Sequence, residues 1–216
     1  MNQFIFAGKS SKNFKIRIEK CPVIHTGQRA IEKITVPGRS GDLIFDTGAF
    51  ANYTQPYEIY FNAKCIGSAR GAAQIANWLL LPRGYQRLDD TYSPETYRMA
   101  SYIGPMEVEN WMLTFGRATI EFDCKPQRFL KSGEFPIKIQ SGQSLYNAWQ
   151  PALPLIQITG TGDGQLVVGK STVNITGMAG NLMLDSEVQN AYDGTTNKNN
   201  SISISGASPC WNMGKA

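Results

Sequence analysis

The stretch GRATIEFDCKPQRF, residues 116–129, decides the fold of this chain. From Ala118 to Cys124, small or apolar residues occupy every even position and polar residues every odd one. A period of two residues is typical of a β-strand with one buried and one polar face. Proline lacks the N–H that a sheet ladder uses, so Pro126 is expected to end the strand. We interpret the stretch as the last core strand of an N-terminal domain, followed by a linker at 129–134.

The composition around this strand is that of a folded, β-rich protein. The chain has 216 residues, of which 42% are hydrophobic and 18% charged, which excludes a disordered chain and is enough for a core. Its 21 glycines and 11 prolines divide it into short runs, as is typical of strands joined by turns. The net charge of +4 includes no block of Lys or Arg, so no nucleic-acid binding is predicted. No run approaches the ~20 apolar residues of a membrane helix, so no membrane insertion is expected.

The cysteines indicate a protein made in a reducing compartment. All four lie far apart in the sequence and form no C-x-x-C pair, which argues against a zinc site. Cys65 and Cys124 have apolar neighbours and are expected to act as small buried residues. The N-terminus lacks the basic and long apolar segments of a secretory signal.

One hairpin and one helix stand out in the first part of the chain. Strand patterns at 31–36 and 43–46 flank the turn-rich loop Pro37–Asp42, which predicts a β-hairpin. Apolar residues recur at helical spacing from Ala69 to Leu80, and Pro82 is expected to end this helix. Further strands are predicted at 4–6, 14–18, 57–63, 97–102 and 108–111.

From Phe135 onward the amino-acid composition changes: charged residues become sparse, and Ser, Thr, Asn and Gly become more frequent. The run Gly160–Gly164 has three alternating glycines but neither the spacing nor the following helix of a dinucleotide-binding loop, so it is interpreted as a hairpin turn. We predict a compact second all-β domain, most simply a sandwich. Its short alternating strands centre on 156–158, 173–175, 182–184 and 202–204.

No catalytic constellation is found. The single histidine, His25, has no candidate nucleophile near it and is expected to pack in a loop. Asp89 and Asp90 lie in the polar segment 84–95, which is expected to form a loop, and neighbours on a strand point to opposite faces. We interpret them as solvated charges rather than paired acids. No catalytic, cofactor-binding or metal-binding residue is therefore predicted, and the chain is not expected to be an enzyme.

Four motifs follow one another across residues 1–135. They are F-x-GKSS from Phe6, VPGRSGDL from Val36, WLL-x-P-x-GY from Trp78, and the opening stretch with its CKPQRF core. In order and spacing they resemble the distal tail protein (Dit) family of long-tailed phages and prophages of Gram-positive bacteria. The resemblance covers the first domain, and the four motifs together are more specific than any one of them.

The resemblance implies a fold. It is mainly β, with an N-terminal ring-forming tail domain at 1–134 and a galectin-like β-sandwich at 135–216. The first domain is expected to carry one α-helix and a projecting hairpin that reaches the neighbouring subunit. Residues 207–216 depart from the family pattern, so whether the sandwich is complete stays open. The inter-subunit hairpin residues are expected to be Val36, Pro37, Gly38, Arg39, Ser40, Gly41, Asp42 and Leu43.

The resemblance also implies a function. Members of this family form a homo-hexameric hub ring at the tail tip of the virion. The ring joins the major tail (tube) protein to a tail-associated lysin or tail fibre protein and to a receptor-binding or baseplate protein. A structural virion protein of this kind is made in the cytoplasm of the bacterial host and needs no cofactor.

The alternative function is a carbohydrate-binding module that adheres to host cell-wall glycans through residues 136–210. Trp149 and Tyr192 are the candidate glycan contacts, because exposed aromatic rings on a β-sandwich stack on sugars. Buried rings would instead fill the core, and core packing is the favoured interpretation of each ring taken alone. The sequence therefore favours the tail-tip hub and keeps the binding module as the alternative.

Overall fold

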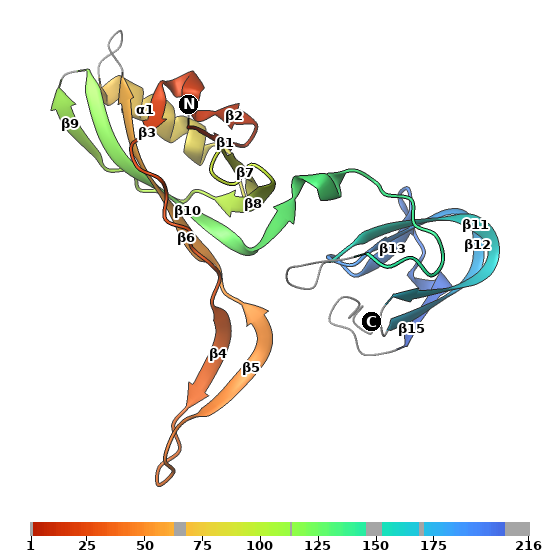
Figure 1. Cartoon of the computed structure of the whole chain (residues 1–216). Helices are drawn as coiled ribbons and strands as arrows, with labels where there is room; N and C mark the ends of the chain where they lie inside the picture. The colour runs from red at the N-terminus through yellow and green to blue at the C-terminus, as the bar shows by residue number, and fades with distance from the viewer. Residues whose placement is uncertain (1, 63–67, 113, 146–152, 169–170, 206–216) are drawn as a thin grey trace. The chain divides into compact units, whose positions relative to one another are not determined.

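The computed structural model describes residues 2–62, 68–112, 114–145, 153–168 and 171–205. The chain divides into two compact units, Met1–Lys138 and Ile139–Ala216. Both units consist mainly of β-strands (Figure 1), which confirms the predicted fold class. The ring-forming and galectin-like characters assigned to the two domains stay predictions.

Within its described residues, the first unit is an eight-stranded antiparallel sheet with one α-helix, α1. The strand order is β2-β1-β7-β8-β10-β6-β3, and β9 also pairs with β10. A separate two-stranded sheet, β4 with β5, belongs to the same unit. The element bounds are β1 Phe4–Phe6, β2 Lys9–Ser10, η1 Ser11–Phe14, β3 Ile16–Ile18, β4 Arg29–Ile34, β5 Leu43–Phe50, β6 Tyr53–Asn62, α1 Ser68–Leu80, β7 Gln86–Asp90, β8 Thr96–Ser101, β9 Val108–Met112, β10 Phe115–Leu130 and η2 Lys131–Glu134.

Strand β10 lies inside the sheet and has the two faces that its sequence predicts. It pairs with β6 from Phe115 to Cys124, while β9 and β8 pair along its other edge. The even-numbered side chains from Ala118 to Cys124 are buried, and the odd-numbered ones between them are exposed or half-buried. Burial raises the pKa of the Cys124 thiol to about 12. The thiol therefore behaves as the small buried residue that was expected.

The prediction that Pro126 ends this strand is wrong. Strand β10 continues to Leu130, and its register against β8 shifts between Cys124 and Arg128. A bulge leaves residues of the longer strand unpaired. The N–H that proline lacks is therefore not needed for a ladder hydrogen bond at this position.

Helix α1 covers one face of the sheet (Figure 1), as its apolar spacing predicts. Ile75 and Leu79 are almost completely buried. Trp78 stacks on Phe14 with a centroid distance of 4.3 Å and on Phe4 at 5.7 Å. Large aromatic rings of this kind supply much of the buried apolar area of a small core.

Gly116→Ala is expected to destabilise the first unit by about 1–3 kcal/mol, the usual cost of overpacking a core. A Cβ atom on Gly116 would lie 2.4 Å from Cζ of Phe61 and 2.9 Å from Cγ1 of Val108. Chemical denaturation measures the loss. Gly133→Ala is the matched control, because its Cβ would approach only Leu130, at 4.0 Å. Equal unfolding midpoints for the two variants would contradict the prediction.

The second unit is built on two long strands, β11 (Leu155–Val168) and β12 (Ser171–Asp185), that pair along their length. The predicted hairpin turn at Gly160–Gly164 is wrong, because these residues lie inside β11. The register between the strands shifts between Gly162 and Gly164. Glycine within a strand typically marks a bulge or a sharp bend. The glycine run therefore bends a continuous strand and does not join two.

Strand β12 carries shorter partners at its two ends. Residues 172–175 pair with β15, and residues 183–185 pair with β13, which in turn pairs with β14. The described residues of the second unit thus form one five-stranded sheet, and side chains from β12 and β13 form its small buried core. The galectin-like topology of this unit stays a prediction. The bounds are β13 Asn190–Asp193, β14 Thr196–Asn197, η3 Asn199–Ser201 and β15 Ile202–Ser205.

Candidate functional site

A projecting hairpin is the candidate functional site, and we call residues 29–50 the arm. Its strands β4 and β5 pair with each other and, within the described residues, with no other strand. The ribbon leaves the body of the first unit (Figure 1). An isolated two-stranded hairpin is at best marginally stable in water. Packing against a further surface would therefore stabilise this hairpin more than any other part of the first unit.

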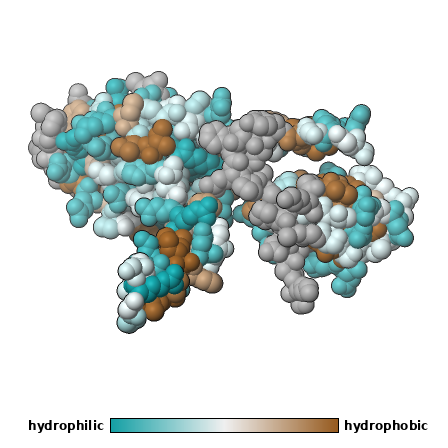
Figure 2. Space-filling model, turned by 60° about the horizontal axis from the view of Figure 1, so that its bottom comes forward, coloured by the Kyte–Doolittle hydropathy of each residue, from teal (hydrophilic) through white to brown (hydrophobic). Residues whose placement is uncertain are grey.

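The pairing register gives the arm two chemically different faces. Ile34 lies opposite Leu43 and Glu32 opposite Phe45, and directly opposed residues of an antiparallel pair share a face. We call Ile34, Leu43 and Phe45 the apolar arm face; they are 47%, 40% and 61% exposed, and the exposed Glu32 lies on the same face. Figure 2 shows brown, hydrophobic surface along the arm. Contiguous exposed apolar side chains are typical of a protein interface.

The opposite arm face is mixed. It carries Lys33 opposite Ile44 and Ile31 opposite Asp46. Asp46 accepts a hydrogen bond from the backbone N–H of Gly48 and pairs with Arg29 at 2.6 Å, and both contacts lower the pKa of its carboxyl group. This face carries two exposed apolar side chains beside Lys33 and an ion pair, whereas the apolar arm face carries three beside Glu32. It is therefore the less suited of the two faces to dry contact.

The predicted inter-subunit residues 36–43 lie at the tip of the arm. The N–H of Arg39 donates to the carbonyl of Val36 at 3.2 Å, and Thr35 donates to Asp42 at 2.8 Å. All eight residues are exposed except Val36, which is half-buried. Their contact with a neighbour stays a prediction. The predicted range 36–43 leaves out Ile34 and Phe45, because the apolar run Leu43-Ile44-Phe45 does not alternate and only the pairing register separates its two faces.

The fold of the chain, with its projecting arm, can be compared with known proteins. No family model and no curated protein matches the chain. Among solved structures, its fold is similar to that of SPP1 Dit. The crystal structure of that protein, gp 19.1, is described as a paradigm of the hub adsorption apparatus in phages that infect Gram-positive bacteria. The match covers 88% of this chain and 82% of SPP1 Dit, with a TM-score of 0.58 and 10% sequence identity.

The likeness to SPP1 Dit shows a shared fold, which agrees with the fold implied by the sequence motifs. At 10% identity it carries no individual residue from one chain to the other. The role of each residue therefore rests on its surroundings in this structure.

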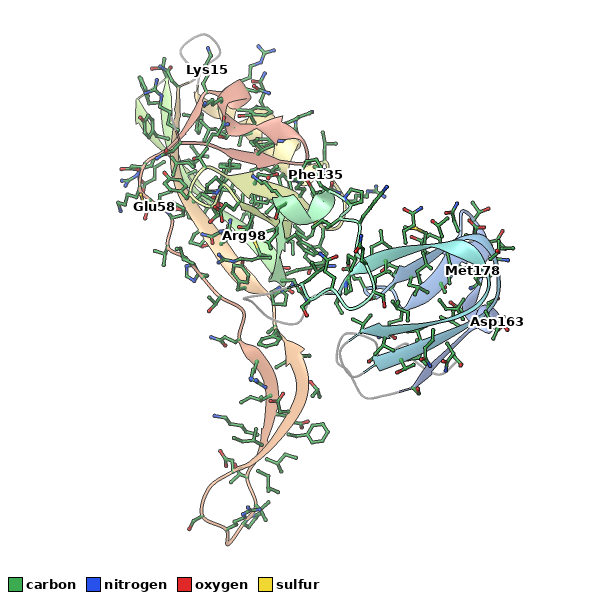
Figure 3. All side chains as sticks on the ribbon, turned by 45° about the vertical axis from the view of Figure 1, so that its right-hand side comes forward. Lys15, Glu58, Arg98, Phe135, Asp163 and Met178 are labelled. Atoms are coloured by element: carbon green, nitrogen blue, oxygen red, sulfur yellow. The ribbon has the colours of Figure 1, made fainter. Side chains whose placement is uncertain are left out.

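A buried charge pair lies inside the first unit. Asp90 ends β7 and Arg98 lies in β8, with side chains 1% and 4% exposed, and Nη1 of Arg98 lies 2.5 Å from Oδ2 of Asp90. Tyr57 donates to the same Oδ2 at 2.7 Å, and the backbone N–H groups of Tyr92 and Ser93 donate to Oδ1. Figure 3 labels Arg98 within this crowded region.

This pair is structural. Burial by itself raises the pKa of Asp90, but the hydrogen bonds from Arg98 and Tyr57 outweigh it and hold that pKa below its usual range. Four donors occupy the carboxylate, which lacks the free lone pair and the access that a general base needs. Asp90 is thus a core residue whose charge is matched inside the protein.

The interpretation of Asp90 as a solvated loop charge is therefore wrong, and residues 86–90 form strand β7 instead of a loop. Asp89 points to the other face of that strand, where it pairs with Arg87 at 2.7 Å and Lys131 at 2.9 Å. The two aspartates do diverge, as strand geometry requires. What the sequence did not show was a buried partner for one of them.

The remaining candidate residues that the structure describes do not form a common site. Trp149 lies outside the described residues, and Tyr192 is half-buried in β13 as the one described aromatic side chain between 139 and 205. His25 is half-buried and accepts a hydrogen bond through its carbonyl oxygen. Across the described ranges, His, Cys, Asp and Glu side chains form no group of three that could hold a metal ion. Where the structure describes the chain, no helix has the length and apolar character to cross a membrane.

Proposed function

We propose that this chain is a structural subunit of a phage tail tip, where copies of it form a hub ring. The observation that carries the proposal is the apolar arm face, exposed on a fold similar to that of SPP1 Dit. The four sequence motifs of the first unit support the same assignment independently. All acceptor positions of the buried Asp90 carboxylate are hydrogen-bonded, so this residue does not suggest a catalytic site. We therefore propose no enzymatic activity for the chain.

The arm suits a head-to-tail contact between copies. A contact between two different surfaces of one chain repeats from copy to copy and closes into a ring when the rotation between copies is right. We infer six copies, the number that the family resemblance implies, with the tip residues 36–43 and the apolar arm face lying on the next subunit. Extended strands with free edges also allow backbone pairing with the receiving subunit.

In the virion, the ring would sit between two sets of partners. The proposal places the major tail protein on one side and a tail fibre, tail-associated lysin or receptor-binding protein on the other. A glycan-binding role of the second unit, through Trp149 and Tyr192, remains the alternative function, and no contact among the described residues favours it.

Negative-stain imaging and light scattering of the purified full-length chain test the proposal. We expect six-fold rings with six times the 23.8 kDa mass of the monomer, alone or after mixing with the tail-tube protein. A chain that stays monomeric under both conditions and binds cell-wall glycans on an array would overturn it in favour of the binding module.

A further inference from the structure

The residues where the arm joins the sheet form a compact set of contacts, which we call the arm root. Strand β5 ends at Phe50 and β6 begins at Tyr53, so Ala51 and Asn52 alone separate the arm from the sheet on that side. The N–H of Ala51 donates to the carbonyl of Gln28 at 2.8 Å and ties the two sides of the ribbon together. A change in the direction of the whole arm relative to the sheet would act at this point.

The exposed side chain of Asn52 makes two hydrogen bonds at the surface of the arm root. Its Nδ2 donates to Oδ2 of Asp123 at 2.9 Å and to the hydroxyl of Tyr85, and Tyr85 also lies 3.3 Å from the same carboxylate oxygen. The ammonium group of Lys125 lies 5.3 Å from the centroid of the Tyr85 ring. A carboxamide has two N–H donors. One side chain therefore ties the bend both to β10 and to the segment before β7.

The other side of the ribbon is held by the same strand. A Cβ atom on Gly27 would lie 2.7 Å from Cβ of Pro126 and 3.2 Å from the carbonyl oxygen of Ala51, so the backbone packs there without room for a side chain. Arg128 donates to the carbonyl of His25 at 2.9 Å. The exit end of β10 thus contacts both sides of the arm root, through Asp123 on one side and through Pro126 and Arg128 on the other.

We propose that the arm root, with Asn52 at its centre, sets the direction of the arm before any partner binds. Eight residues of β5 span about 26 Å, so a swing of about 15° at the root would move the tip by about 7 Å. An arm fixed in its bound direction loses less conformational freedom on binding. The angle between copies also decides whether a head-to-tail chain closes or grows as an open filament. This last consequence rests on the proposed ring, whereas the fixed direction does not.

The contacts of Asp123 and Arg128 described here lie at the arm root. The exit end of β10 therefore belongs to the arm root. Asn52, Asp123 and Tyr85 are positioning residues in this assignment, since they act through the arm.

Distances between two spin labels in the full-length chain test the proposal. One label replaces Ser40 at the arm tip and the other replaces exposed Glu95 on the body, after serine replaces every native cysteine except buried Cys124. An excess of unlabelled protein restricts the measurement to distances within one chain. For Asn52→Ala we expect a distribution about twofold broader than in the parent, because the bend loses both hydrogen bonds.

Three further variants make the outcome specific. Gly27→Ala is expected to broaden or shift the distribution by the independent route of steric overlap with Pro126. Asp123→Asn keeps an acceptor oxygen for Asn52 and is expected to retain most of the parent distribution. Glu121→Gln, on the same face of β10 and outside the root, should change nothing. An unchanged distribution in both Asn52→Ala and Gly27→Ala would overturn the proposal even if rings still form, and a broadened arm in a chain that never forms rings would leave it intact.

Discussion

Replacing Leu43 and Phe45 by serine is expected to abolish ring assembly while each subunit stays folded. The two side chains are 40% and 61% exposed in the single chain, so a neighbour can bury a further half of each. That burial is worth about 1 kcal/mol or more per side chain. Their loss therefore weakens each contact between copies by about 30-fold or more. Because every contact in the ring carries the same defect, the losses multiply, and light scattering should report a monomer.

Ile44→Ser is the matched control for this prediction. Ile44 lies between the two replaced residues and is 63% exposed, but its register places it on the opposite arm face. We expect it to assemble nearly as the parent chain does. Circular dichroism should show the same fold for both variants, since the arm contributes nothing to either core. Loss of rings in Ile44→Ser with intact rings in the double variant would reverse the assignment of the faces.

The arm also illustrates what the sequence could predict. A glycine-rich tip between two strand-like runs has local causes, namely turn chemistry and alternation, and the hairpin formed as expected. The same is true of β10, where alternation alone identified the buried face, and of α1, whose apolar spacing and following Pro82 set its extent. These features depend on residues close together in the chain, which a single sequence displays directly.

The predictions were wrong where the local structure depends on pairing with a strand elsewhere in the chain. Pro126 was expected to end β10, but a bulge against β8 accommodates it, and no pattern within the strand reveals the partner's register. The glycines of β11 were interpreted as a turn because three glycines in five residues are typical of one. Their place inside a strand depends on pairing with β12, whose residues come later in the chain. The arm root brings together 25–28, 51–52, Tyr85 and the end of β10, and their separation in sequence concealed it.

Asp90 is the clearest case of this kind. A carboxylate in a polar run is normally solvated, and QRLDD lacks the apolar alternation of a buried strand. The signal that could have found it is the opposite charge of Arg98 on the returning strand. If 86–90 and 96–101 pair as a hairpin around Ser93, the two residues fall on one face. The prediction of a loop at 84–95 prevented that comparison.

Asp90→Asn is expected to destabilise the first unit by about 3–5 kcal/mol, the usual cost of removing one partner from a buried ion pair. Arg98 would keep its charge in a nearly inaccessible site, and a carboxamide replaces one of the two acceptor oxygens with a donor. Urea denaturation monitored by tryptophan fluorescence measures the loss, since Trp78 is buried in the same core. Asp89→Asn is the control, because its partners Arg87 and Lys131 are 40% and 33% exposed and pairs of that kind are worth about 1 kcal/mol or less each.

The pH dependence of the same variant gives a second measurement. The pKa of Asp90 in the folded protein lies below its ordinary value of about 3.9, so its ionisation contributes stability that is complete above that pH. This contribution is lost as the pH falls through the pKa of the folded state. The stability gap between the parent and Asp90→Asn should therefore be constant near neutral pH and narrow in acid. A gap that stays constant into acid would mean that the ionised form of Asp90 is not what stabilises the fold.

The double variant Asp90→Asn/Arg98→Met separates the value of the pair from the cost of breaking it. Removing one partner of a buried ion pair leaves an uncompensated buried charge, whereas removing both charges leaves none. We therefore expect the double variant to regain much of the stability lost in Asp90→Asn, with a coupling energy of about 1–3 kcal/mol between the two sites. Additive losses would instead mean that Asp90 acts mainly by accepting the hydrogen bonds of Tyr57, Tyr92 and Ser93. In that case the carboxylate stabilises the turn after β7, and the charge of Arg98 is satisfied by other groups.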